Sequence, residues 1–173
     1  MAGSSPMFPA SLISSETAVS LPEGFKIRPL EKGDYAKGFL ECLRDLTWMG
    51  NLTEAEFNER YDEMSSLGKG PYYYLVIEHQ GRVVGTGAVI VEKKFIHNRA
   101  LVGHVEEICI AKEHQGNGMG LIMVNALNSV AANAGCYKTI LNCGPKNEPF
   151  YEKCGYTNSG MEMVRNLREW KES

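Results

Sequence analysis

The stretch that decides the fold reads His104-Val-Glu-Glu-Ile-Cys-Ile110 and continues, four residues later, as Gln115-Gly-Asn-Gly-Met-Gly120. The first part belongs to a β-branched, strand-like run that we expect to span Leu101 to Ile110. The second part is a glycine-rich turn. A stripe of apolar residues with helical spacing follows, formed by Met119, Ile122, Met123, Ala126, Leu127 and Val130. The order of strand, glycine turn and helix predicts a tight backbone bend directly before a helix.

The glycine turn suits the binding of a phosphate or pyrophosphate. Its glycines allow successive backbone N–H groups to turn inward, and the start of a helix carries about half a positive charge. A Walker loop is excluded because the Gly-Lys-Ser/Thr triplet is absent, and a Rossmann fingerprint is excluded because Leu121 or Met123 stands where its sixth-position glycine would be. From the residues alone, an anion-binding turn and a turn that only redirects the chain remain equal alternatives.

The elements around this stretch predict a mixed α/β sheet. Two strand-like runs, Tyr72 to His79 and Arg82 to Val91, are joined by Gln80-Gly81 and indicate a hairpin. With the strand at 101–110 they form an antiparallel meander. After the helix we expect a strand at 137–141, a short helix at 147–154 and a last strand at 161–167. Because a strand–helix–strand crossover must be parallel, the fold class is an antiparallel meander followed by a parallel β-α-β unit.

Two helices are predicted between a first strand at 25–28 and the hairpin. Asp34 is expected to cap the first helix. Thr53 and Glu56 have the spacing of a capping box at the start of the second helix. The apolar stripes expected on these helices are Tyr35, Phe39, Cys42, Leu43 and Leu46, and then Phe57, Tyr61 and Met64.

The composition is that of an ordinary globular domain. The chain has 173 residues, of which 43% are hydrophobic and 23% charged, with a net charge of −3. The length suits a single domain, placed at 21–173, and the Ser-rich residues 1–20 are expected to be a flexible N-terminal tail. The acidic balance argues against broad nucleic-acid binding, and no apolar run is long enough to cross a membrane. Five cysteines without metal-ligand spacing indicate reduced thiols in the cytoplasm and no metal.

The pattern Gln115-x-x-Gly118-x-Gly120, between a meander strand and a helix, resembles the pyrophosphate-binding motif of the GCN5-related N-acetyltransferases. Further segments resemble one subfamily, the glucosamine 6-phosphate N-acetyltransferases. These segments are Gly103-His-Val-Glu-Glu-Ile108, Gly135-Cys-Tyr-Lys138, Asn147-x-x-Phe-Tyr-x-Lys-Cys-Gly155, Leu46-Thr47 and Lys94-Phe-Ile-His97. The resemblance implies acetyl transfer from acetyl-CoA to the amino group of D-glucosamine 6-phosphate, a step toward UDP-N-acetylglucosamine, in a homodimer with the sugar site at the interface.

The same resemblance implies where acetyl-CoA is held. The backbone of Ile108, Cys109 and Ile110 would pair with the pantetheine arm, which requires the third and following strands to separate. The pyrophosphate would bind Gln115, Gly116, Asn117, Gly118, Met119, Gly120 and Leu121. Asn147 and Tyr151 complete the implied cofactor site.

Three residues are candidates for the chemistry. The resemblance assigns Tyr151 to protonating or stabilising the leaving thiolate, and a phenol with a free pKa of about 10 can protonate a thiolate whose acid has a pKa of about 8.5. Without the motif, Tyr151 would be interpreted as a packing residue. Glu106 and Glu107 are neighbours on a strand and are expected to face opposite sides. Either one is a candidate for orienting or deprotonating the amine, and a solvated or ion-paired carboxylate is the alternative.

Substrate contacts are likewise implied by the resemblance. They fall on Thr47, Lys94, His97, Glu106, Glu107, Tyr137 and Lys138. Asn142 stands where the family has an acidic residue, so it keeps an acceptor oxygen but loses the charge. Arg165 lies one residue away from the family's phosphate-binding arginine. Two alternatives are an acetyltransferase of this fold for another amine or a protein N-terminus, and an acetyl-CoA-binding module without catalysis.

Overall fold

The computed structural model describes residues 5–65 and 69–168. The chain divides into two compact units, Met1–Leu141 and Asn142–Ser173. The first unit carries the sheet and most of the helices, and the second carries one short helix. In the described part of the chain, no helix is both long and apolar enough to span a bilayer.

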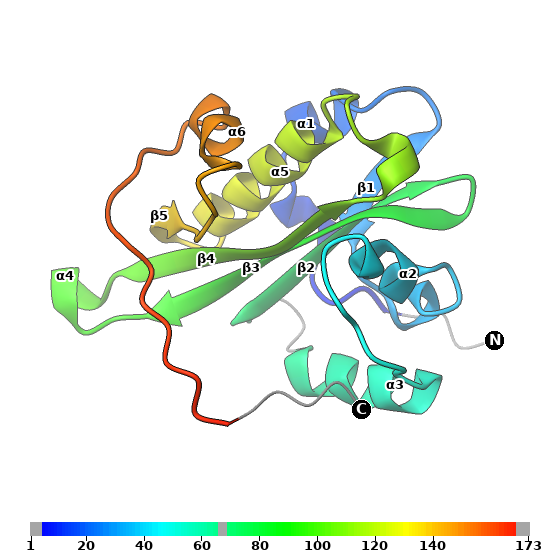
Figure 1. Ribbon diagram of the computed structural model, residues 1–173, viewed down its shortest axis with the longest axis horizontal. Coiled ribbons are helices and arrows are strands. Elements are labelled where there is room, and N and C mark those ends of the chain that lie inside the picture. Colours follow the sequence, from blue (N-terminus) through cyan, green and yellow to red (C-terminus); the bar gives the residue numbers. More distant parts are fainter. Residues whose placement is uncertain (1–4, 66–68, 169–173) are drawn as a thin grey trace. The chain divides into compact units, whose positions relative to one another are not determined.

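The sheet has five strands in the order of the sequence, β1-β2-β3-β4-β5 (Figure 1). Their bounds are β1 (Phe25–Pro29), β2 (Tyr72–His79), β3 (Arg82–Lys93), β4 (Leu101–Ile110) and β5 (Cys136–Ile140). The first four pair antiparallel, and β5 runs parallel to β4. This arrangement confirms the predicted mixed sheet, an antiparallel meander followed by a parallel β-α-β unit.

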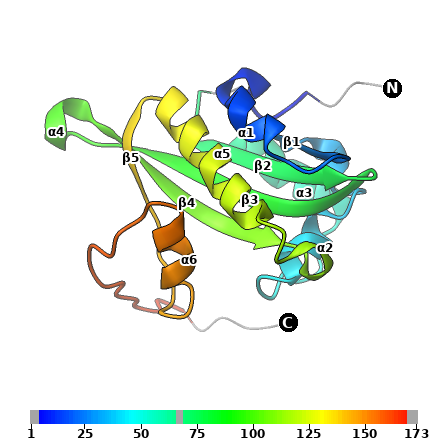
Figure 2. The same ribbon diagram turned by 90° about the horizontal axis from the view of Figure 1, so that it is seen from above.

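Helices of the first unit cover both faces of this sheet. Figures 1 and 2 show α5 crossing one face with α1 beside it, whereas α2 lies against the opposite face. The helical segments are η1 (Ala10–Leu12), α1 (Ser15–Val19), η2 (Lys32–Asp34), α2 (Phe39–Arg44), α3 (Glu54–Met64), α4 (Ile96–Arg99), η3 (Lys112–His114), α5 (Met119–Asn133) and, in the second unit, α6 (Glu148–Lys153).

The β2–β3 hairpin forms where the sequence predicts it. Both residues of its turn have positive φ, 48° at Gln80 and 76° at Gly81. Two positive φ angles match the twist of the flanking strands, which is why such turns favour glycine. The capping box at the start of α3 is also confirmed, since Glu56 N–H donates to the Thr53 hydroxyl at 3.3 Å and Thr53 N–H donates to the Glu56 carboxylate at 2.8 Å.

The predicted apolar stripe of α5 packs onto the sheet. Met119, Met123 and Leu127 are at most 1% exposed, and burying each side chain contributes about 1.5–3 kcal/mol. Beneath them, Gly87 of β3 leaves room for the helix, because a Cβ there would lie 2.9 Å from Leu127 Cδ1 and 3.0 Å from Met123 Cγ. Absence of a side chain at position 87 therefore sets how closely α5 approaches the sheet.

The segment before β1 differs from the flexible tail that we expected at residues 1–20. Within its described part, Met7 and Phe8 are 0% and 1% exposed. Met7 N–H donates to the Leu30 carbonyl at 2.9 Å, and the Phe8 ring meets the Tyr73 ring edge-on at 5.3 Å. Two large apolar side chains are enough to anchor this Ser-rich segment in the core.

Asp34 is not the N-cap of the following helix, contrary to the prediction; its carboxylate instead accepts the Glu31 N–H at 2.8 Å, in a capping box of the short helix η2. It ends η2 and is completely buried, and α2 begins only at Phe39, after Gly38 with φ 89°. The reason is a partner outside the local sequence: Arg28 of β1 donates two hydrogen bonds to the Asp34 carboxylate, at 2.6 and 2.8 Å. A buried carboxylate needs such a charged partner, and Arg28 supplies it in addition to the local capping contact from Glu31.

The predicted last strand at 161–167 is wrong. Residues 156–166 form neither helix nor strand, and the apolar side chains of this segment are exposed. Met161 and Met163 are each 92% exposed, and Leu167 is 85% exposed. Alternating apolar residues form a strand only where a neighbouring strand accepts their hydrogen bonds, and the described sheet ends at β5.

Candidate functional site

The outer edge of β4 is hydrogen-bonded to another strand along only the first part of its length. β5 pairs with β4 only from Leu101 to His104, where His104 faces Ile140. β5 ends there, so residues 106–110 of β4 have no pairing with β5 (Figure 2). Backbone polar groups at such an edge need other partners. The edge is therefore available to an extended ligand that pairs like an added strand.

A β-bulge lies at the start of this unpaired edge. Thr86 of β3 faces Cys109 and Ala88 faces Glu106, so Gly87 alone opposes two residues of β4. Glu107 has φ +52°, a left-handed conformation that is uncommon in a strand. The hydroxyl of the fully buried Thr86 donates to the Glu107 carbonyl at 3.1 Å. This contact fixes the bulge from inside the sheet.

The bulge interrupts the regular alternation on which the prediction for Glu106 and Glu107 is based. Both residues are exposed, and their carboxylates lie close enough to interact. Desolvation of the Glu107 carboxylate raises its pKa, the charge of Glu106 raises it further, and a hydrogen bond from Tyr74 lowers it. Desolvation also raises the pKa of Tyr74, as does the negative charge of Glu107. Glu107 thus combines an accessible position with a carboxylate that binds a proton more readily than an ordinary glutamate.

The glycine turn is open and forms the link between β4 and α5. Gly116 and Gly118 have φ of +83° and +77°, and a Cβ at either position would meet nothing within 4 Å. Glycine is therefore favoured at both positions by the positive φ, and not because a larger side chain would clash with a neighbour. The first turn of a helix has N–H groups without intrahelical acceptors, and here these belong to Met119, Gly120 and Leu121. Inward-facing N–H donors and the helix dipole together suit an anion.

Gln115 holds the turn against the strand. Its side-chain amide donates to the Ile110 carbonyl at 2.8 Å, so the glutamine closes back on the end of β4. Gln115 therefore positions the turn, and its side-chain amide is already engaged in this contact.

A second group of predicted residues gathers at the other end of β3 and β4, around α4. Lys94 forms an ion pair with Glu92 at 2.6 Å, and His104 contacts the other Glu92 oxygen at 2.8 Å. His97 has a left-handed backbone, with φ +51°, which projects the α4 turn beyond the strand ends. Figure 2 shows this projection.

Residues of β5 extend this group. The His97 and Tyr137 rings lie 5.9 Å apart, and Lys138 Nζ lies 5.5 Å from the centre of the Tyr137 ring. We call Lys94, His97, Tyr137 and Lys138 the α4 cluster. Its cations and ring donors suit a phosphate or sugar hydroxyls.

The structure does not bring all predicted substrate residues together within one chain. Thr47 N–H donates to the Leu43 carbonyl of α2 at 3.2 Å, and α2 contacts β4 at Cys109. Cys109 lies eight positions after Leu101, where the α4 turn joins β4, and at about 3.3 Å per residue these eight steps span roughly 25 Å. Figures 1 and 2 show α2 and α4 toward opposite ends of these strands.

The remaining predicted residues lie in the second unit. Asn147 precedes α6, and its side chain makes no capping hydrogen bond. Tyr151 is half-buried within α6, and its ring lies 5.0 Å from that of Phe150 and 6.1 Å from that of Tyr156. Asn142 and Arg165 are exposed and belong to no helix or strand. The roles assigned to Asn147, Tyr151, Asn142 and Arg165 stay predictions.

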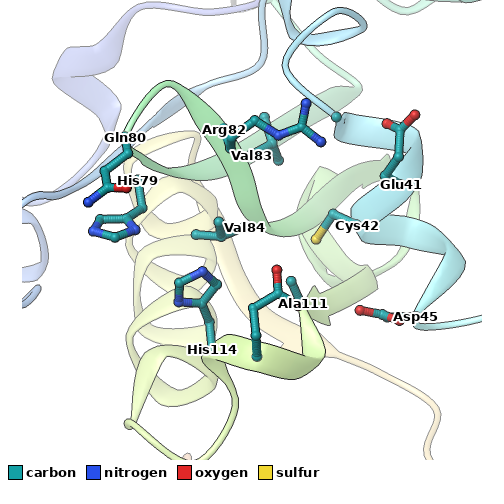
Figure 3. Close-up of a pocket in the computed structure, with 12 residues that line it drawn as sticks. Glu41, Cys42, Asp45, His79, Gln80, Arg82, Val83, Val84, Ala111 and His114 are labelled. Atoms are coloured by element: carbon teal, nitrogen blue, oxygen red, sulfur yellow. The ribbon is translucent and has the colours of Figure 1, made fainter.

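A pocket that the sequence analysis did not find opens on the α2 side of the sheet, with a volume of about 370 Å³ (Figure 3). Three segments that are far apart in sequence build its walls: α2, the β2–β3 turn and η3. They contribute Gly38, Glu41, Cys42, Asp45, His79, Gln80, Arg82, Val83, Val84, Ala111, Glu113 and His114. No local motif marks such a site. The described residues contain no group of three or more His, Cys, Asp or Glu that could hold a metal ion.

Comparison with known proteins agrees with this geometry. A model of the acetyltransferase (GNAT) family matches residues 38–156. The glucosamine 6-phosphate N-acetyltransferase of Candida albicans is 44% identical over 144 residues, which cover 83% of this chain and 97% of that protein. The protein of the same name from Arabidopsis thaliana is 40% identical over 147 residues, covering 84% of this chain and 98% of that protein.

Solved structures give the same result. The crystal structure of glucosamine-6-phosphate N-acetyltransferase from Arabidopsis thaliana superimposes with a TM-score of 0.80 at 39% identity, covering 84% of this chain and 100% of that chain. An acetyltransferase with acetyl-CoA from Clostridium acetobutylicum, at 14% identity and a TM-score of 0.64, shares the fold, covering 83% of this chain and 96% of that chain. The chain therefore belongs to the acetyltransferase (GNAT) family and, within it, to the family of the glucosamine 6-phosphate N-acetyltransferases.

Proposed function

We propose that the protein transfers the acetyl group of acetyl-CoA to the 2-amino group of D-glucosamine 6-phosphate, releasing CoA and N-acetyl-D-glucosamine 6-phosphate. The observation that carries this proposal is the edge of β4, which is unpaired with β5 and leads directly into an open, glycine-rich turn. The names of relatives that align over four-fifths of the chain support the choice of amino sugar. The product would serve UDP-N-acetylglucosamine synthesis in the cytoplasm, which agrees with five free cysteines.

In this proposal, acetyl-CoA binds along the edge of β4. The backbone of Ile108, Cys109 and Ile110 pairs with the pantetheine arm, and the amides of residues 115–121 hold the pyrophosphate. The fit rests on the strand edge, on the first-turn N–H groups of α5 and on the positive φ angles of the turn. Asn147 and Tyr151 of the second unit complete the cofactor site.

The chemistry needs a base for the amine and an acid for the thiol. The amine attacks in its neutral form, and Glu107, assisted by Glu106, takes the proton that the nitrogen loses as the C–N bond forms, because its carboxylate has a raised pKa and is accessible. The amine nitrogen attacks the thioester carbonyl carbon, an N–H group near Ile108 or Cys109 stabilises the developing oxyanion, and the C–S bond breaks. Tyr151 donates its phenolic proton to the leaving thiolate. Transfer is direct, without an acetylated protein side chain.

The amino sugar requires residues that one chain holds apart. Thr47 is bonded to the last turn of α2, which contacts β4 at Cys109, and the α4 turn joins β4 at Leu101, roughly 25 Å away at about 3.3 Å per residue. Glu106 and Glu107 lie between these two points on β4. We therefore propose a homodimer in which the α4 cluster of one copy completes the sugar site of the other copy. Asn142 and Arg165 are proposed to contact the sugar and its phosphate.

Mass spectrometry of the reaction product tests the proposed function. The full chain is incubated with acetyl-CoA and, in parallel, with glucosamine 6-phosphate, unphosphorylated glucosamine, a polyamine and a peptide with a free N-terminus. We expect acetylation of the phosphorylated sugar only. Acetylation confined to another amine would overturn the substrate assignment. Asn142 motivates this comparison, because it lacks the charge of the acidic residue that the family has at this position. Binding of CoA without acetylation of any amine would indicate a non-catalytic module.

A further inference from the structure

Two cysteine side chains meet between α2 and β4. Cys42 and Cys109 are 67 positions apart in sequence, and both are buried, with 3% and 5% of their surface exposed. The Cys109 thiol donates a hydrogen bond to the Cys42 carbonyl at 3.1 Å. The side chains of Cys42 and Cys109 also lie close enough to shift each other's pKa. The two cysteine residues are therefore neighbours between α2 and β4, and both are free thiols.

A small molecule can approach this pair from the Cys42 side, through the pocket of Figure 3. Cys42 is one of the pocket-lining residues, and its sulfur points from α2 into the cavity, toward Val84 and Ala111 (Figure 3). The volume of about 370 Å³ greatly exceeds the roughly 30 Å³ that one water molecule occupies in the liquid. Buried thiols are usually inert because reagents do not reach them, but here one of the pair borders a solvent-connected pocket.

The surroundings of Cys109 lower the pKa of its thiol. The hydrogen bond from the Cys42 thiol lowers the pKa of Cys109, and the charge of Lys112 lowers it further, whereas burial and the carboxylate of Asp45 raise it. The same hydrogen bond raises the pKa of Cys42, as do burial and the charges around it, and only the Ala111 N–H opposes this. Cys109 is therefore the candidate nucleophile. Cys42 is the candidate for the second thiol, which attacks the oxidised sulfur of Cys109 to form the disulfide.

We propose that Cys42 and Cys109 form a reversible disulfide when the protein meets a hydroperoxide, so that oxidation covalently ties α2 to the cofactor-binding strand. The Cys109 thiolate attacks one peroxide oxygen, the O–O bond breaks, and the departing oxygen takes a proton and leaves as water or alcohol. The Cys42 sulfur then gives up its proton and attacks the sulfenic sulfur. The S–S bond forms, the S–O bond breaks and water leaves, so two thiols are oxidised while the hydroperoxide is reduced.

The link would act on the proposed acetyl transfer, and this part of the inference rests on the proposed function. A disulfide has an S–S distance of about 2.05 Å, which is shorter than a contact between two thiols. Forming the bond therefore draws α2 toward β4. Thr47 is hydrogen-bonded to the last turn of α2, and Cys109 lies between Ile108 and Ile110. We expect oxidation to lower the rate of acetyl transfer and a thiol reductant to restore it.

The disulfide is tested on the full chain without any substrate. The reduced protein is treated with hydrogen peroxide, its remaining thiols are alkylated, and its peptides are mapped by mass spectrometry without reduction. We expect a cross-linked pair of peptides containing Cys42 and Cys109, which disappears on treatment with dithiothreitol. Cys42→Ser and Cys109→Ser should each abolish the cross-link, whereas Cys143→Ser, which removes an exposed thiol, should leave it intact. Sulfinic or sulfonic acid at Cys109 without a cross-link would overturn the proposal, as would two unmodified thiols under conditions that oxidise Cys143.

Activity is measured on the same samples. The oxidised wild-type protein should lose most of its acetyl transfer, and Cys42→Ser should keep its rate at the same peroxide concentration. Cys42→Ala serves the same purpose if a buried serine unfolds the chain. A cross-link that forms without loss of rate would overturn the coupling to α2. If the reduced protein never acetylates the sugar, the proposed function is contradicted. The disulfide proposal is then judged by the peptide mapping alone.

Discussion

Glu107 combines three properties that rarely occur together in a strand residue: a left-handed backbone, an exposed position and a carboxylate with a raised pKa. If it is the base, the rate should fall as the pH drops through this raised pKa, that is, above the ordinary glutamate value of about 4.3. Glu107→Gln should lower kcat/KM by about 10²–10⁴-fold, the usual contribution of general base catalysis. The pH profile of kcat/KM measures both effects.

The same substitution has the opposite effect on stability. A carboxyl group whose pKa is higher in the folded state stabilises the fold while it is protonated, and this contribution is lost as the pH rises through the folded pKa. Glu107→Gln should therefore raise the Tm at pH 7, and the gain should vanish at acidic pH. Glu113→Gln, at an exposed carboxylate outside the proposed catalytic residues, is the control and should leave kcat/KM unchanged. Full activity of Glu107→Gln would exclude Glu107 as the base.

Tyr151 offers a separate test of the acid. Tyr151→Phe keeps the ring that packs on Phe150 and Tyr156 but removes the hydroxyl. Turnover should fall by about 10²-fold or more, with little change in acetyl-CoA affinity, because only the proton donor is lost. Steady-state kinetics and calorimetric binding measure the two quantities. Tyr156→Phe is the matched variant with the neighbouring hydroxyl removed, and an equal loss of turnover there would argue against a specific role for Tyr151.

At the scale of elements, the β4–α5 turn depends on the backbone of its glycines. Gly118 has φ +77°, where a Cβ costs about 1–2 kcal/mol even though it would meet nothing within 4 Å. Gly118→Ala should therefore destabilise the protein by this amount and weaken acetyl-CoA binding, since the N–H groups change direction. Gly33→Ala is the control: its Cβ would also meet nothing within 4 Å, but Gly33 has no positive φ, so acetyl-CoA affinity should stay unchanged. Isothermal calorimetry measures the affinity, and equal affinities for both variants would contradict a role of the turn.

The buried ion pair between β1 and η2 gives a test of stability. Asp34 is fully buried and accepts two hydrogen bonds from Arg28, and Arg28 also contacts Glu78 of β2. Asp34→Ala leaves a buried guanidinium with part of its charge uncompensated, which should lower the free energy of unfolding by about 3–5 kcal/mol. The midpoint of urea unfolding measures this loss. Asp62→Ala breaks an exposed pair with Lys32 and should change the midpoint little, and a similar shift in both variants would contradict the structural role of Asp34.

The elements with regular patterns could be predicted from the sequence, and those that depend on distant partners could not. The hairpin turn, the capping box of α3 and the apolar face of α5 depend on local conformation and spacing. Asp34 has a local capping preference, but Arg28 decides its position. The strand predicted at 161–167 has the right alternation but no neighbour to pair with.

The same reason separates the predictable part of the candidate site from the rest. The glycine turn and the strand before it form a continuous motif, so their residues could be named from the sequence. The bulge at Glu107 depends on the register with Thr86 and Gly87 of another strand. The pocket beside Cys42 is built from three distant segments, and no local pattern indicates it.

For the whole molecule, the separation between α2 and α4 is the feature that bears on assembly. If each sugar site combines Glu107 of one copy with the α4 cluster of the other, a variant that lacks Glu107 and a variant that lacks an α4-cluster residue should complement each other. Co-expressed Lys94→Ala and Glu107→Gln chains should form mixed dimers with one intact site, recovering about a quarter of wild-type activity if chains pair at random. A mixture of Lys94→Ala and His97→Ala, both within the α4 cluster, should recover none.

Complementation is measured as the acetylation rate of the purified mixture, with the molecular mass determined by light scattering. A wild-type protein that is monomeric and fully active would contradict the shared site. So would a dimer whose complementary variants stay inactive when mixed.

Gly87 has a practical consequence for anyone who wishes to change the acceptor of this enzyme. Because Leu127 and Met123 occupy the space where its side chain would be, any side chain at position 87 forces these two residues of α5 to move. A mutagenesis library should keep this glycine constant and vary the α4 turn, where Phe95 is 99% exposed within the single chain.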